Sequence, residues 1–229
     1  MEGETEVWLL SELARQCGYH FEAEGVRVIE FAQCGLKPLL RFARRMGIEW
    51  HALVDGDEAG KKYANTVRSL LDNHGDSERD RLTALPAPDM EHFMFREGFS
   101  PVYHRVASVP KNAQMPIRKV ILKAVHHSSK PDLAIEVAMQ AGEWGTDSVP
   151  PLLKKMFSRV IWLARAGRIR RPAVLSGTEM FSHSLFQFIQ QLITTAVFCP
   201  FLADHLIDRF TRDALRQQEV AAVEHLAAH

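Results

Sequence analysis

The chain has 229 residues, enough for one large domain or two small ones with a buried core. A hydrophobic content of 46% beside 24% charged residues excludes wholesale disorder. The three cysteines, Cys17, Cys34 and Cys199, are far apart and odd in number, which excludes a disulfide framework and a cysteine-paired zinc site and predicts a reducing, cytoplasmic environment.

The net charge of zero conceals an uneven distribution. Residues 1–100 carry 12 Lys/Arg and 18 Asp/Glu, whereas residues 101–171 carry 13 Lys/Arg and only 4 Asp/Glu. The remaining residues, 172–229, carry 3 Lys/Arg and 6 Asp/Glu. An acidic first part beside a basic second part suits a metal site that faces a polyanion, although solvated helix faces give the same pattern.

Helices alternate with strands in the first hundred residues. The run "EVWLLSELARQC" (6–17) predicts an amphipathic helix, and "VRVIEFA" (26–32) predicts a strand. A basic-faced helix follows over 35–47, a second strand "IEWHALV" over 48–54, and a helix over 61–72. A short strand and a turn with two prolines complete the pattern in "RLTALPAPDMEHFM". Such alternation predicts an α/β domain with a parallel sheet.

Strand patterns end after Pro101. Three helices are predicted there, over 115–129, 130–143 and 149–167, each with a proline at or near its start. The apolar run 183–202 contains three glutamines, two threonines and a proline, so it falls short of a membrane span and no membrane is expected as a partner. An amphipathic helix is predicted after it, for core cover or contact with a second copy of the chain.

The strongest local motif is "ALVDGDEAG", in which an apolar strand ends at Asp55-Gly56-Asp57. In open α/β sheets, ligands bind at the carboxyl ends of the strands. Two carboxylates this close repel each other unless a cation neutralises them, and Mg²⁺ prefers oxygen ligands. An EF-hand loop is excluded because Ala59 and Thr66 occupy ligand positions. A phosphoryl-transfer aspartate and a plain Asp/Gly surface turn stay open.

Two further acidic pairs accompany this one. The chain begins with Glu2 and Glu6, four residues apart and so on one face of a helix, and the next strand is followed by Asp89 and Glu91. If the sheet brings the pairs together, six carboxylates can hold two metal ions, the arrangement that catalyses phosphodiester cleavage by in-line displacement. The six predicted metal ligands are Glu2, Glu6, Asp55, Asp57, Asp89 and Glu91.

The order of these motifs resembles a known family. "EGETE" and "DGDEAG" resemble the Toprim domain of topoisomerases, bacterial primases and several nucleases. The longer series "EGETEVWLL", "CGLKPLLRFARRMGIEWHALVDGDEAG", "LPAPDMEHF" and "SSKPDLAIEVA" is similar to the C-terminal region of overcoming-lysogenization-defect (OLD) family nucleases, over roughly residues 2–166. That family joins an ATPase domain to a Toprim nuclease with a helical insertion or extension.

The resemblance implies roles for individual residues. Glu2 matches the Toprim glutamate, a metal ligand or general acid/base, and the other five carboxylates match metal ligands. The family also places a lysine near the scissile phosphate, and "SSKPDLA" makes Lys130 the candidate, with Lys154 or Lys155 as the alternative. His92, which follows Glu91, is a candidate to hold a metal ligand in place. The implied cofactors are two Mg²⁺ or Mn²⁺ ions.

The sequence departs from the family pattern at its start. The family has an apolar strand before the first glutamate, and only Met1 precedes Glu2 here. No Walker motif is present, so the ATPase function would belong to another domain or subunit. We therefore expect a Toprim region without its first strand: a fragment of a longer protein, a chain that works with a separate partner, or a decayed remnant.

The expected fold is an N-terminally truncated Toprim-like α/β region over 1–100, a helical region over 101–171 and a helical tail of unknown role over 172–229. The expected function is a metal-dependent DNA endonuclease that nicks or cuts phosphodiesters, with DNA and an ATPase domain or subunit as partners and a homodimer through the tail. The alternative is an inactive binding or assembly module. A primase- or topoisomerase-like Toprim is disfavoured by the Asp89/Glu91 pair and by the lack of a tyrosine-bearing cleavage domain.

Overall fold

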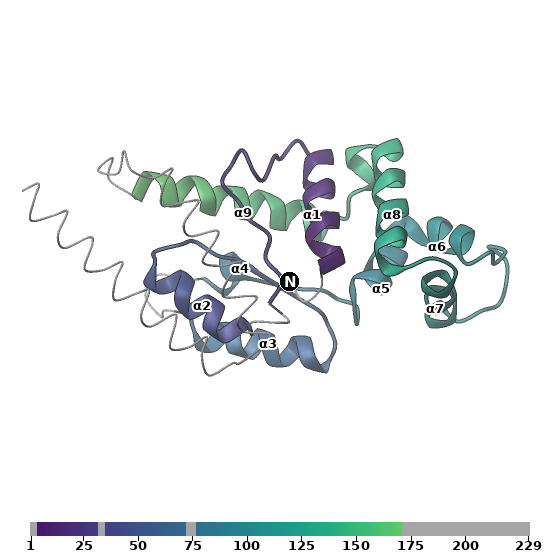
Figure 1. The fold of residues 1–229 in the computed structure, drawn as a ribbon, viewed down its shortest axis with the longest axis horizontal. Coiled ribbons are helices and arrows are strands. Elements are labelled where there is room, and N and C mark those ends of the chain that lie inside the picture. Colours follow the sequence, from purple (N-terminus) through teal and green to yellow (C-terminus); the bar gives the residue numbers. More distant parts are fainter. Residues whose placement is uncertain (1–3, 32–34, 72–76, 171–229) are drawn as a thin grey trace, which may run out of the picture. The chain divides into compact units, whose positions relative to one another are not determined.

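A computed structural model describes residues 4–31, 35–71 and 77–170, and the side chains of residues 6–31, 35–71 and 77–167 (Figure 1). Residues 4–31, 50–71 and 77–169 belong to one compact unit, and residues 35–49 belong to a second. The tail helices predicted over 172–229 lie outside the described residues. The expected domain boundaries at 100 and 171 stay predictions.

Among the described residues of the first unit, the sheet has two parallel strands, β1 (Ala52–Val54) and β2 (Leu82–Ala84). Ala52 pairs with Leu82 and Val54 pairs with Ala84. The helices α3 (Glu58–Ser69) and α4 (Glu78–Arg81) lie between the two strands in the sequence. Every residue of β1 is buried, which explains why its sequence is a continuous apolar run. The prediction of a parallel α/β arrangement is confirmed at this coarse level.

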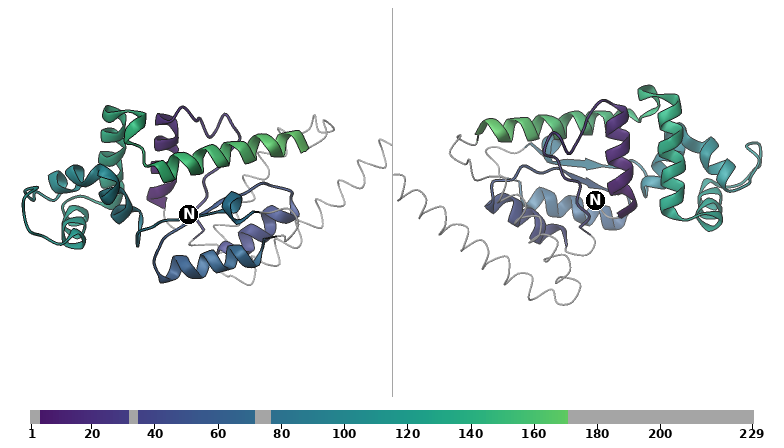
Figure 2. Two further views of the ribbon diagram at one scale, coloured as in Figure 1. Left: turned by 180° about the vertical axis from the view of Figure 1, so that it is seen from behind. Right: turned by 45° about the horizontal axis from the view of Figure 1, so that its top comes forward.

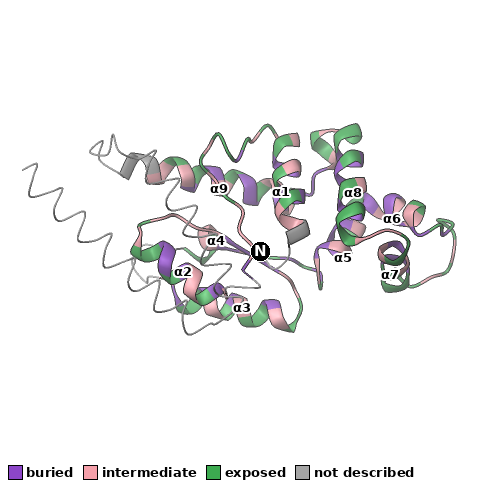
Figure 3. Ribbon diagram, in the orientation of Figure 1, coloured by how far each residue is buried: buried purple, intermediate pink, exposed green. Residues whose placement is uncertain are grey.

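The rest of the first unit is mostly helical. Its core is continuous from Leu9 and Leu13 in the N-terminal helix to Phe157 in the last one. Figure 3 shows buried residues on one side of these helices and exposed residues on the other. In chain order the remaining elements are α1 (Glu4–Gln16), α5 (Met90–Met94), the kinked turn η1 (Phe95–Phe99), α6 (Ser100–Val106), α7 (Ile117–His127), α8 (Lys130–Trp144), the short turn η2 (Thr146–Ser148) and α9 (Pro151–Arg170).

Packing between these helices follows their apolar faces. The N-terminal helix α1 packs along α8, and α6 packs against both α7 and α8. The segment after α1 runs beside α9 (Figure 2). It packs there through an edge-to-face contact of Phe21 with Phe157, whose ring centroids are 5.7 Å apart. The ion pair of Arg159 with Asp80, 3.1 Å long and largely shielded from solvent, joins α9 to α4. None of the described helices is long and apolar enough to cross a membrane.

Several local predictions are confirmed. Helices form where the apolar periodicity indicates them, in α1 and in the three long helices after residue 115. Prolines stand at or next to their starts, with Pro116 before α7, Pro131 in the first turn of α8 and Pro151 at the first position of α9. The helix predicted over 35–47 is α2 (Leu36–Arg45), which belongs to the second unit and buries Leu36, Leu40 and Phe42.

The prediction of a strand over residues 26–32 is wrong for residues 26–31, which form no strand in the structure. Val26 and Val28 are partly buried against the core while Arg27 is exposed, so the alternating pattern does report a half-buried surface. That surface pairs with neither β1 nor β2. Periodicity indicates which side chains are covered but does not specify the neighbouring strand. The helices α5 and α6 were also not predicted.

His51 joins the start of β1 to the segment that leads into β2. Its Nδ1–H donates to the carbonyl oxygen of Asp80 at 2.8 Å, and its Nε2 lies 2.8 Å from the hydroxyl of Thr83. Burial lowers the pKa of the ring, and the charges of Arg81 and Arg159 add to this, while the hydrogen bond to the Asp80 carbonyl and the Asp80 carboxylate oppose it. The folded chain therefore takes up this proton at a lower pH than the unfolded chain does.

We expect the free energy of unfolding to be pH-dependent through this group. The contribution of His51 to the free energy of unfolding is fully present above the unfolded pKa of about 6.5. As the pH drops below that value the contribution decreases, by at most about 1.4 kcal/mol per pH unit, because the unfolded state then binds more protons. Urea unfolding between about pH 8 and pH 5.5 should show a smaller decline for His51→Gln than for the wild type. Parallel declines would contradict this assignment.

Candidate functional site

Asp55 and Asp57 lie in the loop that follows β1, and this loop is fixed to the loop that follows β2. The amide of Leu85 donates to the carbonyl oxygen of Val54 at 2.9 Å, and the amide of Gly56 donates to the carbonyl oxygen of Ala87 at 2.9 Å. The hydrogen-bonding ladder thus continues past both strands. A Cβ atom at position 56 would lie 2.5 Å from the carbonyl oxygens of Leu85 and Ala87, so glycine is required for this approach.

Asp57 begins helix α3 as its N-cap residue. Its Oδ1 accepts a hydrogen bond from the amide of Gly60 at 2.7 Å. Gly60 is buried against the preceding loop, and a Cβ atom added there would collide with the carbonyl oxygen of Asp55. One capped turn therefore holds both aspartates of the "DGD" motif.

Asp89 has the equivalent position after β2. It is the N-cap residue of α5, and its Oδ1 accepts a hydrogen bond from the amide of His92 at 2.7 Å. The Nδ1 of His92 also lies 2.7 Å from Oδ1 and 2.9 Å from Oδ2 of the same carboxylate. The histidine therefore holds the Asp89 carboxylate directly.

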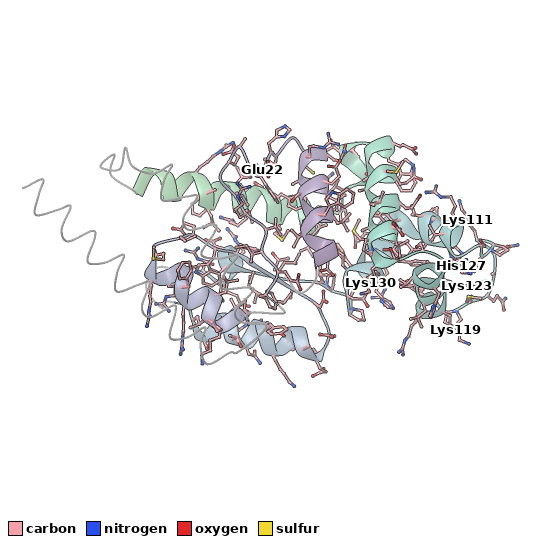
Figure 4. All side chains as sticks on the ribbon, in the orientation of Figure 1. Glu22, Lys111, Lys119, Lys123, His127 and Lys130 are labelled. Atoms are coloured by element: carbon pink, nitrogen blue, oxygen red, sulfur yellow. The ribbon has the colours of Figure 1, made fainter. Side chains whose placement is uncertain are left out.

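Lys130 and Glu91 form an ion pair, with Nζ 2.9 Å from Oε1. Helix α8 positions the lysine, since the Oγ of Ser129 accepts a hydrogen bond from the amide of Asp132 and the helix starts at Lys130 (Figure 4). The Glu91 side chain is only 16% exposed and that of Lys130 is 57% exposed. The site thus has a fixed carboxylate and a lysine that solvent can reach.

Three carboxylates act on this lysine. Partial burial is the largest single influence on the pKa of Lys130 and lowers it, but the hydrogen bond to Glu91 and the charges of Glu91, Glu6 and Asp89 outweigh it, so the pKa is raised. Lys130 is therefore a permanent cation near neutral pH and cannot serve as a base. The charges of Glu6, Asp89 and Glu91 all act on this ammonium group, and Glu91 forms the ion pair with it. One oxygen of Glu6 is buried.

The other candidates have different surroundings. Lys154 lies 3.9 Å from Asp147, and its charge acts on Cys17, so the structure does not place it at the Lys130 carboxylates. Lys155 is exposed on α9. Glu2 lies outside the described residues. Among the side chains that the structure describes, no three His, Cys, Asp or Glu residues form a group that could hold a metal ion.

Tyr103 is a neighbour of the site that sequence reasoning missed. The side chain is 2% exposed in the core, and burial raises the pKa of its hydroxyl, with additional contributions from the charges of Glu91 and Asp89. The phenol therefore stays protonated close to these carboxylates. The apolar spacing of α6 gives no signal for this, because the residue is an ordinary core aromatic by pattern. The roles of Asp57 and Asp89 as caps could have been found, because aspartate is a preferred N-cap residue.

Comparison with known proteins matches part of the chain to one family. Residues 1–57 match the model of the TOPRIM domain of overcoming lysogenization defect protein-like proteins. The chain is 73% identical over 165 residues to the uncharacterized protein YbjD of Escherichia coli (strain K12). That alignment covers 72% of this chain and 30% of the relative, so the chain spans less than a third of the relative's length. No solved structure matches the chain. The match at residues 1–57 supports an OLD-like Toprim region that includes the "DGD" aspartates.

Proposed function

We propose that the chain is the catalytic region of a divalent-metal-dependent DNA nuclease. One observation carries this proposal. The hydrogen bond between Gly56 and Ala87 fixes the loop of Asp55 and Asp57 to the loop that leads to Asp89 and Glu91, and Lys130 lies against Glu91. Carboxylates with an adjacent cation at the carboxyl ends of parallel strands suit the binding of a phosphodiester through a metal ion.

The chemistry of the donors fits Mg²⁺ or Mn²⁺, because carboxylate oxygens are the ligands that these hard cations prefer. The residues that would hold the ions are Glu2, Glu6, Asp55, Asp57, Asp89 and Glu91. The N-cap bond occupies Oδ1 of Asp57, and its second oxygen can turn to a cation. When bound, such ions activate water and stabilise developing phosphate charge. Lys130 would donate to a phosphate oxygen, since its raised pKa keeps it charged.

The proposal extends to the rest of the molecule. The resemblance to OLD-family endonucleases supports an ATPase domain or subunit as a partner of this region. Residues 172–229 are proposed to pair two copies of the chain through their amphipathic pattern.

Nicking of supercoiled plasmid by the full chain tests the proposed function. We expect open-circular DNA to accumulate with Mg²⁺ or Mn²⁺ and not with EDTA. Circular dichroism of the same sample would verify that the chain is folded. Nicking that persists in EDTA would contradict a metal-dependent mechanism.

A second candidate is an inactive module for binding or assembly. The observation that favours it is that Asp57 and Asp89 both have a purely structural use as helix caps. Folded chain without nicking under any metal would support this candidate. Nicking above the EDTA level would exclude it.

A further inference from the structure

The segment that runs from Gly98 to Pro131, through α6 and α7 into the first turn of α8, contains no acidic residue. Between Glu97 and Asp132 there is no Asp or Glu, while the same stretch holds six basic residues, Arg105, Lys111, Arg118, Lys119, Lys123 and Lys130. The positive charge of this stretch is therefore not balanced locally along the chain. Most of it lies on α7 and in the segments that flank this helix.

Helix α7 turns its apolar residues inward and its basic residues outward. Val120, Ile121 and Ala124 are buried in the core of the unit. Lys119 and Lys123 are four residues apart and so lie on one face, and His127 follows after another four. Lys130 comes next, at the first position of α8. We call Lys119, Lys123, His127 and Lys130 the basic strip (Figure 4).

The strip has charge available for an external partner. Lys119 is exposed and Lys123 is half-buried, and neither forms an ion pair with any residue that the structure describes. Lys111 and Arg118, beside the strip, are exposed as well. The last member of the strip, Lys130, follows the turn between α7 and α8, and its ammonium contacts Glu91. Two lysines with uncompensated charge on α7 therefore precede, in the sequence, the lysine of the candidate metal site.

We infer that the basic strip is the track on which the phosphate backbone of a nucleic acid lies as it enters the carboxylate site. This inference rests on the proposed function, which places a phosphodiester next to Lys130. Lysines four residues apart on a helix are separated by a rise of about 6 Å, enough for two different phosphates of a polyanion to be contacted. Lysine contacts to phosphate set affinity and position but not base sequence.

A nucleic acid fits this surface better than an anionic membrane does. A membrane-surface helix buries an apolar face in lipid, and the apolar face of α7 is already buried in the protein. Only Ile117 and Leu122 among its large apolar residues are exposed, at 37% and 50%. A phosphodiester chain satisfies both the cations of the strip and the proposed metal site.

The test measures binding without cleavage. Fluorescence anisotropy of a labelled duplex of about 30 base pairs in EDTA, between about 50 and 200 mM KCl, gives affinity and its salt dependence. We expect Lys119→Gln/Lys123→Gln to weaken binding about tenfold or more at the low-salt end and to reduce the slope of log Kd against log salt by about 2. The weakening should be the same for duplexes of different sequence.

A matched variant isolates the strip from total charge. Lys37→Gln/Arg79→Gln removes two exposed basic residues elsewhere and should leave the affinity within about twofold of the wild type. Three outcomes would each overturn the inference. The two double variants could weaken DNA binding equally, or the folded wild type could fail to bind DNA. The third is binding that depends on the strip for phosphatidylserine vesicles but not for DNA. Because EDTA prevents metal-dependent cleavage, strip-dependent binding without nicking in Mg²⁺ would refute the proposed nuclease and leave the strip standing.

Discussion

Gly60→Ala should lower the free energy of unfolding by about 1–3 kcal/mol and displace Asp55. The physical reason is the contact between the first turn of α3 and the carbonyl oxygen of Asp55, where an added Cβ has no room. Backbone must move because no flexible side chain stands there to give way. A shift of about 1 Å at a catalytic group can cost about a hundredfold in rate, so nicking should fall as well.

Gly142→Ala is the matched control for this substitution. Gly142 lies in helix α8, and an added Cβ would meet only the side-chain amide of Gln16, at 3.4 Å. Alanine is the better helix former, so this variant should gain roughly 0.5–1 kcal/mol. Urea unfolding of both variants gives the comparison. A Gly60→Ala chain as stable and as active as the wild type would show that the loop does not hold Asp55.

Lys130→Gln should reduce metal-dependent nicking by about 100-fold, the usual cost of removing one donor to developing negative charge. Its raised pKa makes Lys130 a permanent cation, and the substitution removes that charge while keeping a polar side chain that is one bond shorter. Stability should change by less than about 1 kcal/mol, because the lysine side chain is more than half exposed and its pair is screened by solvent. Nicking rate and urea unfolding are measured on the same protein.

Arg105→Gln provides the control for Lys130. Arg105 pairs with Glu136 at 2.8 Å and is 56% exposed, so it matches Lys130 in exposure and in the loss of one ion pair. This ion pair joins α6 to α8 and includes none of the six proposed metal ligands. We expect this variant to nick at close to the wild-type rate. Equal losses in the two variants would assign Lys130 a purely structural role.

The fold could be predicted in part from the sequence. The long helices carry a sustained apolar period, and prolines mark their starts, so local signals and packing agree for α7, α8 and α9. The absence of a strand over 26–31 could not be predicted from the local pattern, because strand pairing depends on which segment lies alongside and not on these residues alone. The short helices α5 and α6 were not predicted, because helices this short on either side of Gly98 contain too few residues to show a helical repeat of apolar positions.

The site was predictable as a set of residues but not as an arrangement. The sequence places Asp55 and Asp89 after the ends of two predicted strands, and so at one edge of the sheet. The hydrogen bond from Gly56 to Ala87 joins the two loops that carry them. The choice of Lys130 came from a family resemblance alone. Its pairing with Glu91 was not predicted, since 39 positions separate these residues and no local pattern links them. The contact of His92 with Asp89 and the place of Tyr103 depend on tertiary packing, which sequence spacing does not specify.

The central claim is that the carboxylates at these strand ends cut DNA, and the nicking rate of Asp55→Asn tests it most directly. The substitution keeps the size of the side chain and leaves both helix caps intact. The exposed Asp147→Asn is its matched control. We predict a rate at least about 100-fold below the wild type for Asp55→Asn, since a metal ligand contributes several kcal/mol to the transition state, and an unchanged rate for Asp147→Asn. Wild-type nicking by Asp55→Asn would contradict the claim.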